Sequence, residues 1–340
     1  MAIRTALIGF GIGGRFFHEP FLGTNSAYAI DAVVTSSPER RAEAARRYRV
    51  LGSTEEVWAR ADEFDLAVVT SPTALHTEHA LAALDAGLHV VVDKPITTSS
   101  AEARQVIEYA EKAERSLSTF QSRRWDAEIR TARTLIDEGA LGEITGLDLA
   151  FQRDVGALRP TWRDANTATA GGGVTFDLGS HLLDQAQYLL GPGRSVTGSV
   201  RRVRGGMADD EMEARLVHES GVVSRILCSW VAPRTRPRLR ITGSEAAYTV
   251  GDTDPQEAAL KRGERPRGDD FGRVPESEWG QLTAADGSSA PVPTRNGDYA
   301  AFYREFARHL RDGGPVPVNP RDAVRTLEFL EVLLAGESAQ

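Results

Sequence analysis

One lysine stands at a position where its chemistry could matter. Among the basic residues only Lys94, Lys112 and Lys261 are lysines, and all the others are arginines. Lys94 follows the apolar run His89–Val92 and precedes Pro95, which predicts a position at the C-terminal end of a buried strand. There an ammonium could donate a hydrogen bond to a reacting oxygen or, if desolvated, give up a proton. A surface lysine whose head snorkels into water at a strand end is the alternative interpretation.

A second polar group follows a run of three glycines, Gly171–Gly173. Because an α-helix has about 3.6 residues per turn, the spacing of Asp177, His181 and Asp184 predicts a helix that carries all three on one face. A carboxylate four residues from a histidine can orient the ring and raise its basicity, which suits proton transfer. An exposed helix with one ion pair is the alternative. The core-facing side would carry Leu178, Leu182, Ala186 and Leu189.

A glycine loop is the third chemical feature. The segment Gly9–Gly14 (GFGIGG) follows the apolar run Ile3–Phe10 and precedes a helical pattern, the context that a G-x-G-x-x-G loop requires. Gly9 permits a tight turn, Gly11 lets a pyrophosphate approach the backbone, and Gly14 lets the helix pack on the strand. Free N–H groups at the helix start then bind phosphates. These residues predict dinucleotide binding.

The end of the second predicted strand favours NADP over NAD. An NAD site usually places Asp or Glu about 20 residues beyond the loop, where it binds the ribose 2′-hydroxyl. Here three hydroxyl residues, Thr35–Ser37, follow the strand, and the first acid is Glu39. The hydroxyls and Arg40 could bind a 2′-phosphate. A pair of surface arginines, Arg40 and Arg41, is the alternative interpretation.

Alternating patterns predict an α/β fold with two domains. In the first ~120 residues short apolar runs alternate with amphipathic stretches, which is typical of a doubly wound parallel Rossmann sheet. After Trp125 the pattern becomes one helix and then strands that alternate as in an antiparallel sheet. We therefore predict a dinucleotide-binding Rossmann domain at 1–122 and a substrate-binding and oligomerisation domain at 123–340. The second would be an α/β domain with a large, mostly antiparallel open sheet.

The element boundaries follow from the same patterns. The polar segment Gly251–Asn296 is expected to form long loops or an insertion. The predicted strands are Ile3–Phe10, Ala29–Val34, Leu66–Thr70, His89–Val92, Ser116–Phe120, Ile144–Phe151, Val196–Val203, Glu213–His218, Val222–Val231 and Leu239–Thr242. The predicted helices include Glu39–Tyr48, Ala74–Ala86, Ala101–Glu114, Glu128–Asp137, Asp298–Arg311 and Pro320–Leu334.

Composition narrows the class of protein. A chain of 340 residues with 41% hydrophobic and 26% charged residues is expected to be globular. A formal net charge of −8 argues against nucleic acid or an anionic membrane as partner. The only cysteine, Cys228, lies in an apolar run, so neither a disulfide nor a cysteine metal cluster is expected. Because Ile3–Phe10 already has a strand pattern, we expect no signal peptide and a cytoplasmic protein.

Three of these segments together resemble the Gfo/Idh/MocA oxidoreductases, NAD(P)-dependent dehydrogenases of sugars and inositols. They are Gly9–Gly14, Asp93-Lys94-Pro95, and the glycine run that leads to Asp177 and His181. The resemblance covers nearly the whole chain. Phe17-His-Glu-Pro, Gln121-Ser-Arg-Arg-Trp-Asp and Asp254-Pro-Gln-Glu look most like the branch that contains NADP-dependent scyllo-inositol dehydrogenases. Two departures are Asp93, where the family usually has glutamate, and Ser122, where that branch has asparagine.

The resemblance implies that Lys94, Asp177 and His181 meet across a domain cleft. We predict reversible hydride transfer between a ring hydroxyl or ketone and the nicotinamide, with His181 as base, Asp177 holding its ring and Lys94 stabilising the reacting oxygen. Lys94 as the proton acceptor is the alternative. An NAD-dependent glycosidase that oxidises transiently and a non-catalytic nucleotide-sensing regulator are the competing functions. No Tyr-x-x-x-Lys is present, which argues against a short-chain dehydrogenase, and no plausible zinc ligand set occurs.

The resemblance also assigns the remaining contacts. Substrate would face Arg123, Trp162 and Arg163, which suits a small polyhydroxylated molecule, and the open sheet would form a homodimer or homotetramer. The role of His18, packing or binding, is left open. The predicted cofactor-binding residues, for NADP with NAD possible, are Gly9, Phe10, Gly11, Ile12, Gly13, Gly14, Thr35, Ser36, Ser37, Arg40, Ser71, Pro72, Thr73, His76, Lys94 and Pro95.

Overall fold

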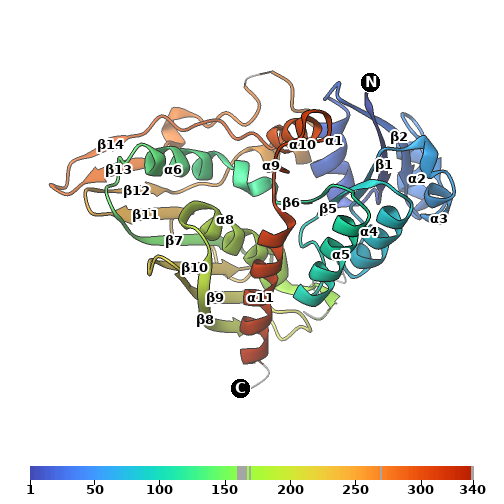
Figure 1. Ribbon diagram of the computed structural model, residues 1–340. Coiled ribbons are helices and arrows are strands. Elements are labelled where there is room, and N and C mark those ends of the chain that lie inside the picture. Colours follow the sequence, from blue (N-terminus) through green and yellow to red (C-terminus); the bar gives the residue numbers. More distant parts are fainter. Residues whose placement is uncertain (159–166, 168–169, 269, 338–340) are drawn as a thin grey trace. The chain divides into compact units, whose positions relative to one another are not determined.

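The computed structural model describes residues 1–158, 167, 170–268 and 270–337. Contacts within the chain divide it into two compact units. The first unit comprises Met1–Ser122, Gln256–Phe271 and Tyr299–Val324, and the second comprises Arg123–Pro255, Gly272–Asp298 and Arg325–Gln340. Each unit has its own sheet, as Figure 1 shows.

The first unit is built on a six-stranded parallel sheet. Its strand order is β3-β2-β1-β4-β5-β6, and every neighbouring pair is parallel. This order confirms the predicted doubly wound sheet, whose ligand crevice lies where the order reverses, beside β1 and β4. The central strands are apolar and almost fully buried, as expected for a sheet covered on both faces. The strands are β1 (Ile3–Ile8), β2 (Tyr28–Val34), β3 (Arg49–Leu51), β4 (Leu66–Val69), β5 (His89–Asp93) and β6 (Leu117–Phe120).

Helices connect these strands in the predicted alternation. Helices α4 and α5 lie side by side along the sheet (Figure 1). A π-helical stretch, Gly13–His18, leads from the glycine loop into α1. The helices of the first unit are α1 (Glu19–Leu22), α2 (Pro38–Ala44), α3 (Glu55–Trp58), α4 (His76–Asp85), α5 (Ser100–Lys112), α9 (Gln256–Lys261), α10 (Ala300–Asp312) and the start of α11 (Pro320–Glu337).

Two late segments belong to the first unit, whereas the predicted division at residue 122 assigned everything after it to the second domain. The reason is visible in α10, which places aromatic side chains in the core of the first unit. The ring of Tyr303 lies 5.4 Å from that of Tyr28, and the ring of Phe302 lies 4.9 Å from that of Phe120. Such pairs bury large apolar areas and so hold the late segment on the earlier one.

The second unit is an eight-stranded open sheet with the order β14-β13-β12-β11-β7-β10-β9-β8. Only β7 and β10 pair in parallel, so the predicted mostly antiparallel sheet is confirmed. Helix α8 packs on this sheet and on α6 (Figure 1). The elements are α6 (Ala127–Asp137), α8 (Ser180–Leu190), β7 (Ile144–Gln152), β8 (Gly193–Arg201), β9 (Glu211–His218), β10 (Val223–Ser229), β11 (Leu239–Gly243), β12 (Ala246–Val250), β13 (Gln281–Ala284) and β14 (Ser289–Pro291).

The prediction of long loops at Gly251–Asn296 was wrong in part. This segment contains α9, β13 and β14, and the sequence pattern also missed β12 just before it. Strand β13 and the edge strand β14 are short and contain no buried residue, so neither shows the apolar alternation by which a strand is recognised.

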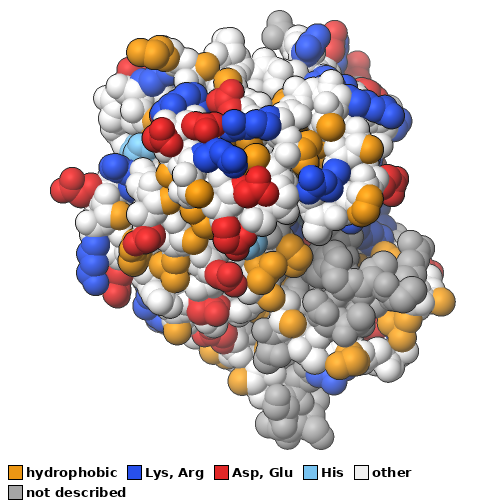
Figure 2. All heavy atoms as spheres, turned by 90° about the vertical axis from the view of Figure 1, so that its right-hand side faces the viewer, with side chains coloured by type: hydrophobic (Ala, Val, Ile, Leu, Met, Phe, Trp, Pro, Cys, Tyr) orange, Lys and Arg blue, Asp and Glu red, His pale blue; other side chains and the backbone are white. Residues whose placement is uncertain are grey.

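The surface shows both signs of charge. Figure 2 shows one face of the molecule, where basic and acidic side chains lie interspersed. In the second unit, Asp148 on β7 pairs with Arg225 on β10 at 3.6 Å and with Arg240 on β11 at 3.1 Å. Among the described residues, no helix has both the length and the apolar character that crossing a membrane requires.

Candidate active site

The glycine loop lies at the C-terminal end of β1, and its glycines face different surroundings. Gly9 has φ +102°, and a Cβ there would lie 2.6 Å from the carbonyl oxygen of Thr70 at the end of β4. A Cβ on Gly14 would overlap the carbonyl oxygen of Gly9. By contrast, apart from its chain neighbours, a Cβ on Gly11 would meet within 4 Å only one atom of the described residues, a guanidinium nitrogen of Arg40 at 3.8 Å. The loop is therefore closed against the sheet at Gly9 and Gly14 and open at Gly11.

Helix α2, which follows β2, contributes a cation beside this opening. Arg40 is exposed, and its guanidinium reaches toward Gly11, as the 3.8 Å distance shows. Ser37 caps α2, because its hydroxyl oxygen accepts a hydrogen bond from the Arg40 N–H at 3.4 Å. Thr35 is buried, whereas Ser36 is exposed. Among the predicted residues here, Ser36 after β2 and Arg40 on α2 are thus the exposed ones.

The loop after β4 is braced by a histidine. His76 is buried, and its ring nitrogens lie 2.8 Å from the carbonyl oxygen of Pro95 and 2.9 Å from that of Ser71. Burial lowers the pKa of His76, although Asp93 and the two carbonyl oxygens act to raise it. His76 therefore connects the loops that follow β4 and β5. Pro72 is exposed and Thr73 is half-buried on the same loop.

Lys94 directly follows β5, as predicted, and is half-buried. Its backbone N–H donates a 2.7 Å hydrogen bond to Oδ1 of Asp93, and its peptide bond to Pro95 is cis. A Cβ on Gly13 would lie 2.5 Å from Oδ2 of the same carboxylate. Asp93 thus connects the glycine loop with the backbone of Lys94 at the carboxyl edge of the sheet.

In the second unit the glycine run sits against an acid that the sequence analysis missed. Asp209 accepts a hydrogen bond from Thr175 N–H at 2.7 Å, and its backbone carbonyl accepts one from Val174 N–H at 2.9 Å. Gly173 has φ +90°, and a Cβ there would overlap the Asp209 carboxylate. Asp209 therefore caps the start of the helical segment that carries Asp177 and His181. The adjacent acids Asp209 and Asp210, just before an apolar strand, are the only local signal.

The helix itself differs from the prediction. Residues Thr175–Gly179 are π-helical and α8 continues from Ser180, so the assumed α-helical spacing does not hold across Asp177. Asp177, His181 and Asp184 are all buried, at 8%, 6% and 2% exposure, and the predicted core residues on the other side are buried as well. The alternative of an exposed helix is therefore wrong, because this helix is enclosed on both sides.

The two predicted acids have different neighbours. Asp184 receives a bidentate pair of hydrogen bonds from Arg124, at 2.8 and 2.7 Å. Asp177 lies 3.9 Å from a guanidinium nitrogen of Arg153. Asp184 thus anchors the segment before α6 to α8, whereas Asp177 faces the end of β7.

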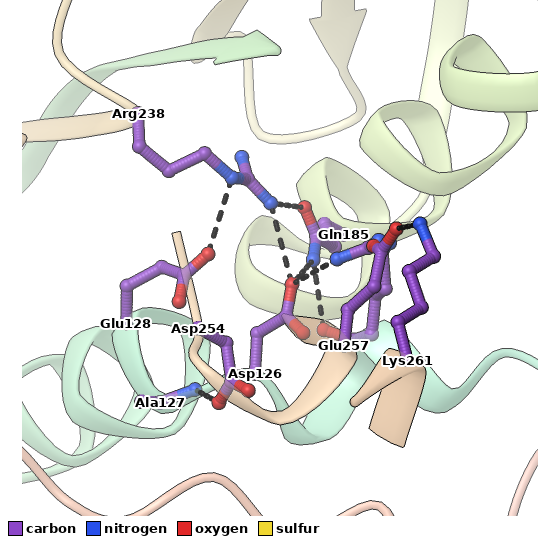
Figure 3. A network of polar contacts seen from close by, with 9 residues as sticks. Asp126, Ala127, Glu128, Gln185, Arg238, Asp254, Glu257 and Lys261 are labelled. Carbon is purple, nitrogen blue, oxygen red and sulfur yellow. Dashed lines mark hydrogen bonds and ion pairs between the residues drawn. The ribbon is translucent and has the colours of Figure 1, made fainter. Parts of the chain in front are cut away.

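A buried polar network holds the segment around Arg123 in place (Figure 3). The Gln185 amide donates to the Arg123 carbonyl at 2.7 Å and to Asp126 at 3.2 Å, and it accepts from Arg238 at 2.7 Å. Arg238 lies 3.1 Å from Glu128. Burial and the nearby Asp126 raise the pKa of Glu128 to about 8, so this carboxyl is mostly protonated at neutral pH.

Arginines gather around one aromatic ring beside this network. The guanidinium carbons of Arg123, Arg153 and Arg238 lie 5.1, 5.5 and 5.5 Å from the centre of the Phe151 ring. Cation–π attraction at this range stabilises each of them. Arg123 is 7% exposed. The other predicted substrate residues, Trp162 and Arg163, lie outside the described residues.

A doubly wound sheet with such a loop is the architecture of a dinucleotide-binding domain, and comparison with known proteins agrees. Residues 3–121 match the oxidoreductase family with an NAD-binding Rossmann fold, and residues 129–249 match the GFO/IDH/MocA C-terminal domain. The chain is 31% identical over 337 residues to scyllo-inositol 2-dehydrogenase (NADP(+)) IolW of Bacillus subtilis, covering 98% of this chain and 93% of that protein. It is 33% identical to the uncharacterized oxidoreductase YdgJ of Escherichia coli, covering 99% and 96%.

The solved structure of Bacillus subtilis YvaA superposes with a TM-score of 0.93 at 28% identity, covering 100% of this chain and 97% of that chain. The chain belongs to the Gfo/Idh/MocA family, as the resemblance predicted. It is an oxidoreductase that acts on CH–OH groups with a nicotinamide cofactor. The glycine loop fits such a cofactor, because it is closed toward the sheet and leaves the backbone at Gly11 open to a pyrophosphate.

Proposed function

We propose that the protein is an NADP-preferring dehydrogenase that transfers a hydride between the nicotinamide and a ring hydroxyl or ketone of a sugar or inositol. The observation that carries the proposal is the opening at Gly11 with the guanidinium of Arg40 beside it. The end of β2 offers no acid for a ribose 2′-hydroxyl, whereas Ser36 and Arg40 suit a 2′-phosphate. The similarity to an enzyme named as NADP(+)-dependent supports the same preference.

Gly9–Gly14, Ser36 and Arg40 would hold the dinucleotide, which supplies the hydride acceptor or donor when bound. In the oxidative direction His181 takes the hydroxyl proton, and Asp177 holds the imidazole in the required tautomer. Burial of both side chains supports this role, because hydrogen bonds and charges act more strongly away from water. Lys94 donates a hydrogen bond to the reacting oxygen and stabilises its developing negative charge.

The substrate is expected to be rich in hydroxyl groups. Arg123 is held by the Gln185 and Phe151 contacts and carries donors that suit polyol oxygens. The test is a screen of inositols, aldoses and their ketones with NAD and NADP, in which the absorbance of the reduced nicotinamide is followed. Substrate-dependent reduction of NADP at a higher kcat/KM than NAD is expected. A clear preference for NAD would contradict the assignment of Ser36 and Arg40, and no turnover with any polyol would contradict the substrate class.

Two variants separate the roles proposed for Lys94. Lys94→Met removes the charge and is expected to lower kcat by about 100-fold or more, comparable to the loss of one oxyanion donor. Lys94→Arg keeps a permanent charge that does not titrate. Near-normal activity of Lys94→Arg would show that Lys94 acts as a fixed positive charge, and the alternative of Lys94 as proton acceptor would then be wrong.

A further inference from the structure

His18 is a buried polar residue that the proposed mechanism does not use. It is 0% exposed on the helical stretch after the glycine loop, with its ring centre 4.2 Å from that of Phe120. Its Nδ1 lies 2.6 Å from the hydroxyl of Tyr303 on α10. All three residues belong to the first unit. Burying an imidazole costs free energy unless its polar atoms are hydrogen-bonded.

The tautomer of His18 follows from its partner. Tyr303 is fully buried, and burial raises the pKa of its hydroxyl well above the usual value, so the hydroxyl stays protonated. The Tyr303 O–H can donate to Nδ1, and the Asp93 carboxylate on the other side of the ring, which only accepts, favours an N–H on Nε2. This nitrogen faces Asp93, 3.7 Å from Oδ2, and within the described part of the chain it has no hydrogen-bond partner. A short movement of either side chain would complete a hydrogen bond.

The opposite side of the Asp93 carboxylate faces Lys94. Its Oδ1 accepts the Lys94 backbone N–H at 2.7 Å, and its Oδ2 lies against Gly13 of the cofactor loop. The titratable groups around it are His18, Lys94, His76 and Tyr303. Burial acts to raise the pKa of Asp93, but His18 and the neighbouring positive charges outweigh it, so the pKa of this carboxyl is lowered.

We infer that His18 and Tyr303 are positioning residues: Tyr303 orients the His18 ring toward the carboxylate of Asp93, and Asp93 in turn fixes the backbone of Lys94 beside the cofactor loop. We call this series of contacts, from Tyr303 through His18 and Asp93 to Lys94, the relay. The inference rests on the proposed function, because positioning Lys94 matters only if Lys94 takes part in the reaction. It also explains why the aspartate and a histidine 75 residues away are placed on adjacent elements, β5 and the stretch after the glycine loop.

Three variants test the relay. His18→Leu fills a similar volume without a donor, His18→Gln keeps an amide N–H that can reach Asp93, and Tyr303→Phe removes only the hydroxyl that orients His18. In His18→Leu the N–H that faces Asp93 is lost, so the effect of burial on the pKa of Asp93 dominates and that pKa rises. The acidic limb of the kcat–pH profile therefore moves to higher pH. We expect His18→Leu to lower kcat about tenfold or more at pH 6 and much less at pH 8, with the KM for NADP changed less than about threefold.

The matched variants distinguish the positioning role of His18 from a role in packing alone. His18→Gln is expected to restore most of the activity lost in His18→Leu, and Tyr303→Phe to move the acidic limb in the same direction by a smaller amount. A loss that is equal at every pH, with no rescue by glutamine, would overturn the inference. If His18→Leu does not fold, Tyr303→Phe still decides, because its shape is unchanged and an unaltered pH profile would count against the relay.

A measurement without turnover separates this inference from the proposed function. The carboxyl carbon of Asp93, assigned by comparison with Asp93→Asn, is titrated by ¹³C NMR in the wild type and in Tyr303→Phe. A higher pKa in the variant supports the relay even if no substrate is found. An unchanged titration sinks the relay while leaving a working dehydrogenase intact. A shifted titration together with a fully active Lys94→Met would instead refute the proposed role of Lys94.

Discussion

Substitution by alanine is expected to have opposite effects on stability at Gly11 and at Gly14, because their surroundings differ. A Cβ on Gly11 would meet only Arg40, at an ordinary contact distance of 3.8 Å, and Gly11 does not have positive φ. Gly11→Ala should therefore leave the fold intact and, by restricting the unfolded chain, stabilise it by about 0.4–1 kcal/mol. The added methyl occupies the opening through which a pyrophosphate approaches, so one or two charge-assisted hydrogen bonds are lost.

At about 1.5–3 kcal/mol for each such bond, we expect the Kd for NADP to rise about 10- to 100-fold or more. In Gly14→Ala the methyl would instead overlap the Gly9 carbonyl oxygen and lie 2.9 Å from the Thr70 hydroxyl. Overpacking of this kind costs about 1–3 kcal/mol of stability. The assays are urea unfolding for stability and calorimetric titration with NADP and NAD for affinity.

The result that would refute this reasoning is specific. If Gly11→Ala binds NADP as tightly as the wild type, the pyrophosphate does not approach at Gly11 and the cofactor site is misplaced. If Gly14→Ala unfolds at the same urea concentration as the wild type, the close packing of Gly14 on Gly9 does not constrain the loop.

Three other predictions follow from the second unit and from the cofactor site. The pKa of Glu128 is about 8 in the folded protein and near 4.5 when unfolded. Its contribution to stability is therefore present at acidic pH and is lost as the pH rises toward 8. Glu128→Gln should raise the thermal midpoint relative to wild type at pH 8.5 but not at pH 5. Asp209→Ala should lower the free energy of unfolding by about 1–2 kcal/mol, because the helix loses its cap, and should also lower kcat. Asp209→Asn keeps an acceptor for Thr175, so both losses should be smaller. Equal losses in the two variants would contradict a capping role. Arg40→Ala should weaken NADP about tenfold with little change for NAD, and a parallel loss for both would place Arg40 away from the 2′-phosphate.

Much of the fold could be predicted because it follows from local patterns. Apolar runs with helical stretches between them bury their side chains well as a covered parallel sheet, so five of its six strands, all except β3, could be predicted. Short exposed strands such as β14 gave no pattern, because an edge strand that faces solvent does not need alternating apolar residues. The π-helical turn at Asp177 was also invisible, since its backbone depends on packing around it.

The partners of the buried charges could not be predicted in the same way. Arg238 meets Asp126 across 112 residues, and His18 meets Tyr303 across 285. Nothing near these residues in the sequence distinguishes them from surface arginines or packed aromatic residues. Such pairs form only because burial requires each polar group to find a partner, wherever the chain supplies one.

The sequence by itself determined the class of the protein. Residue types with unique chemistry, the glycines of the loop, Lys94 before Pro95 and the histidine after a glycine run, are recognisable without neighbours because their spacing is short. The tertiary structure decided what surrounds them: that Asp209 caps the helix of His181, that Asp184 is held by Arg124, and that His18 faces Asp93. Local spacing sets the backbone conformation, whereas the electrostatic surroundings of a side chain depend on segments that only folding brings together.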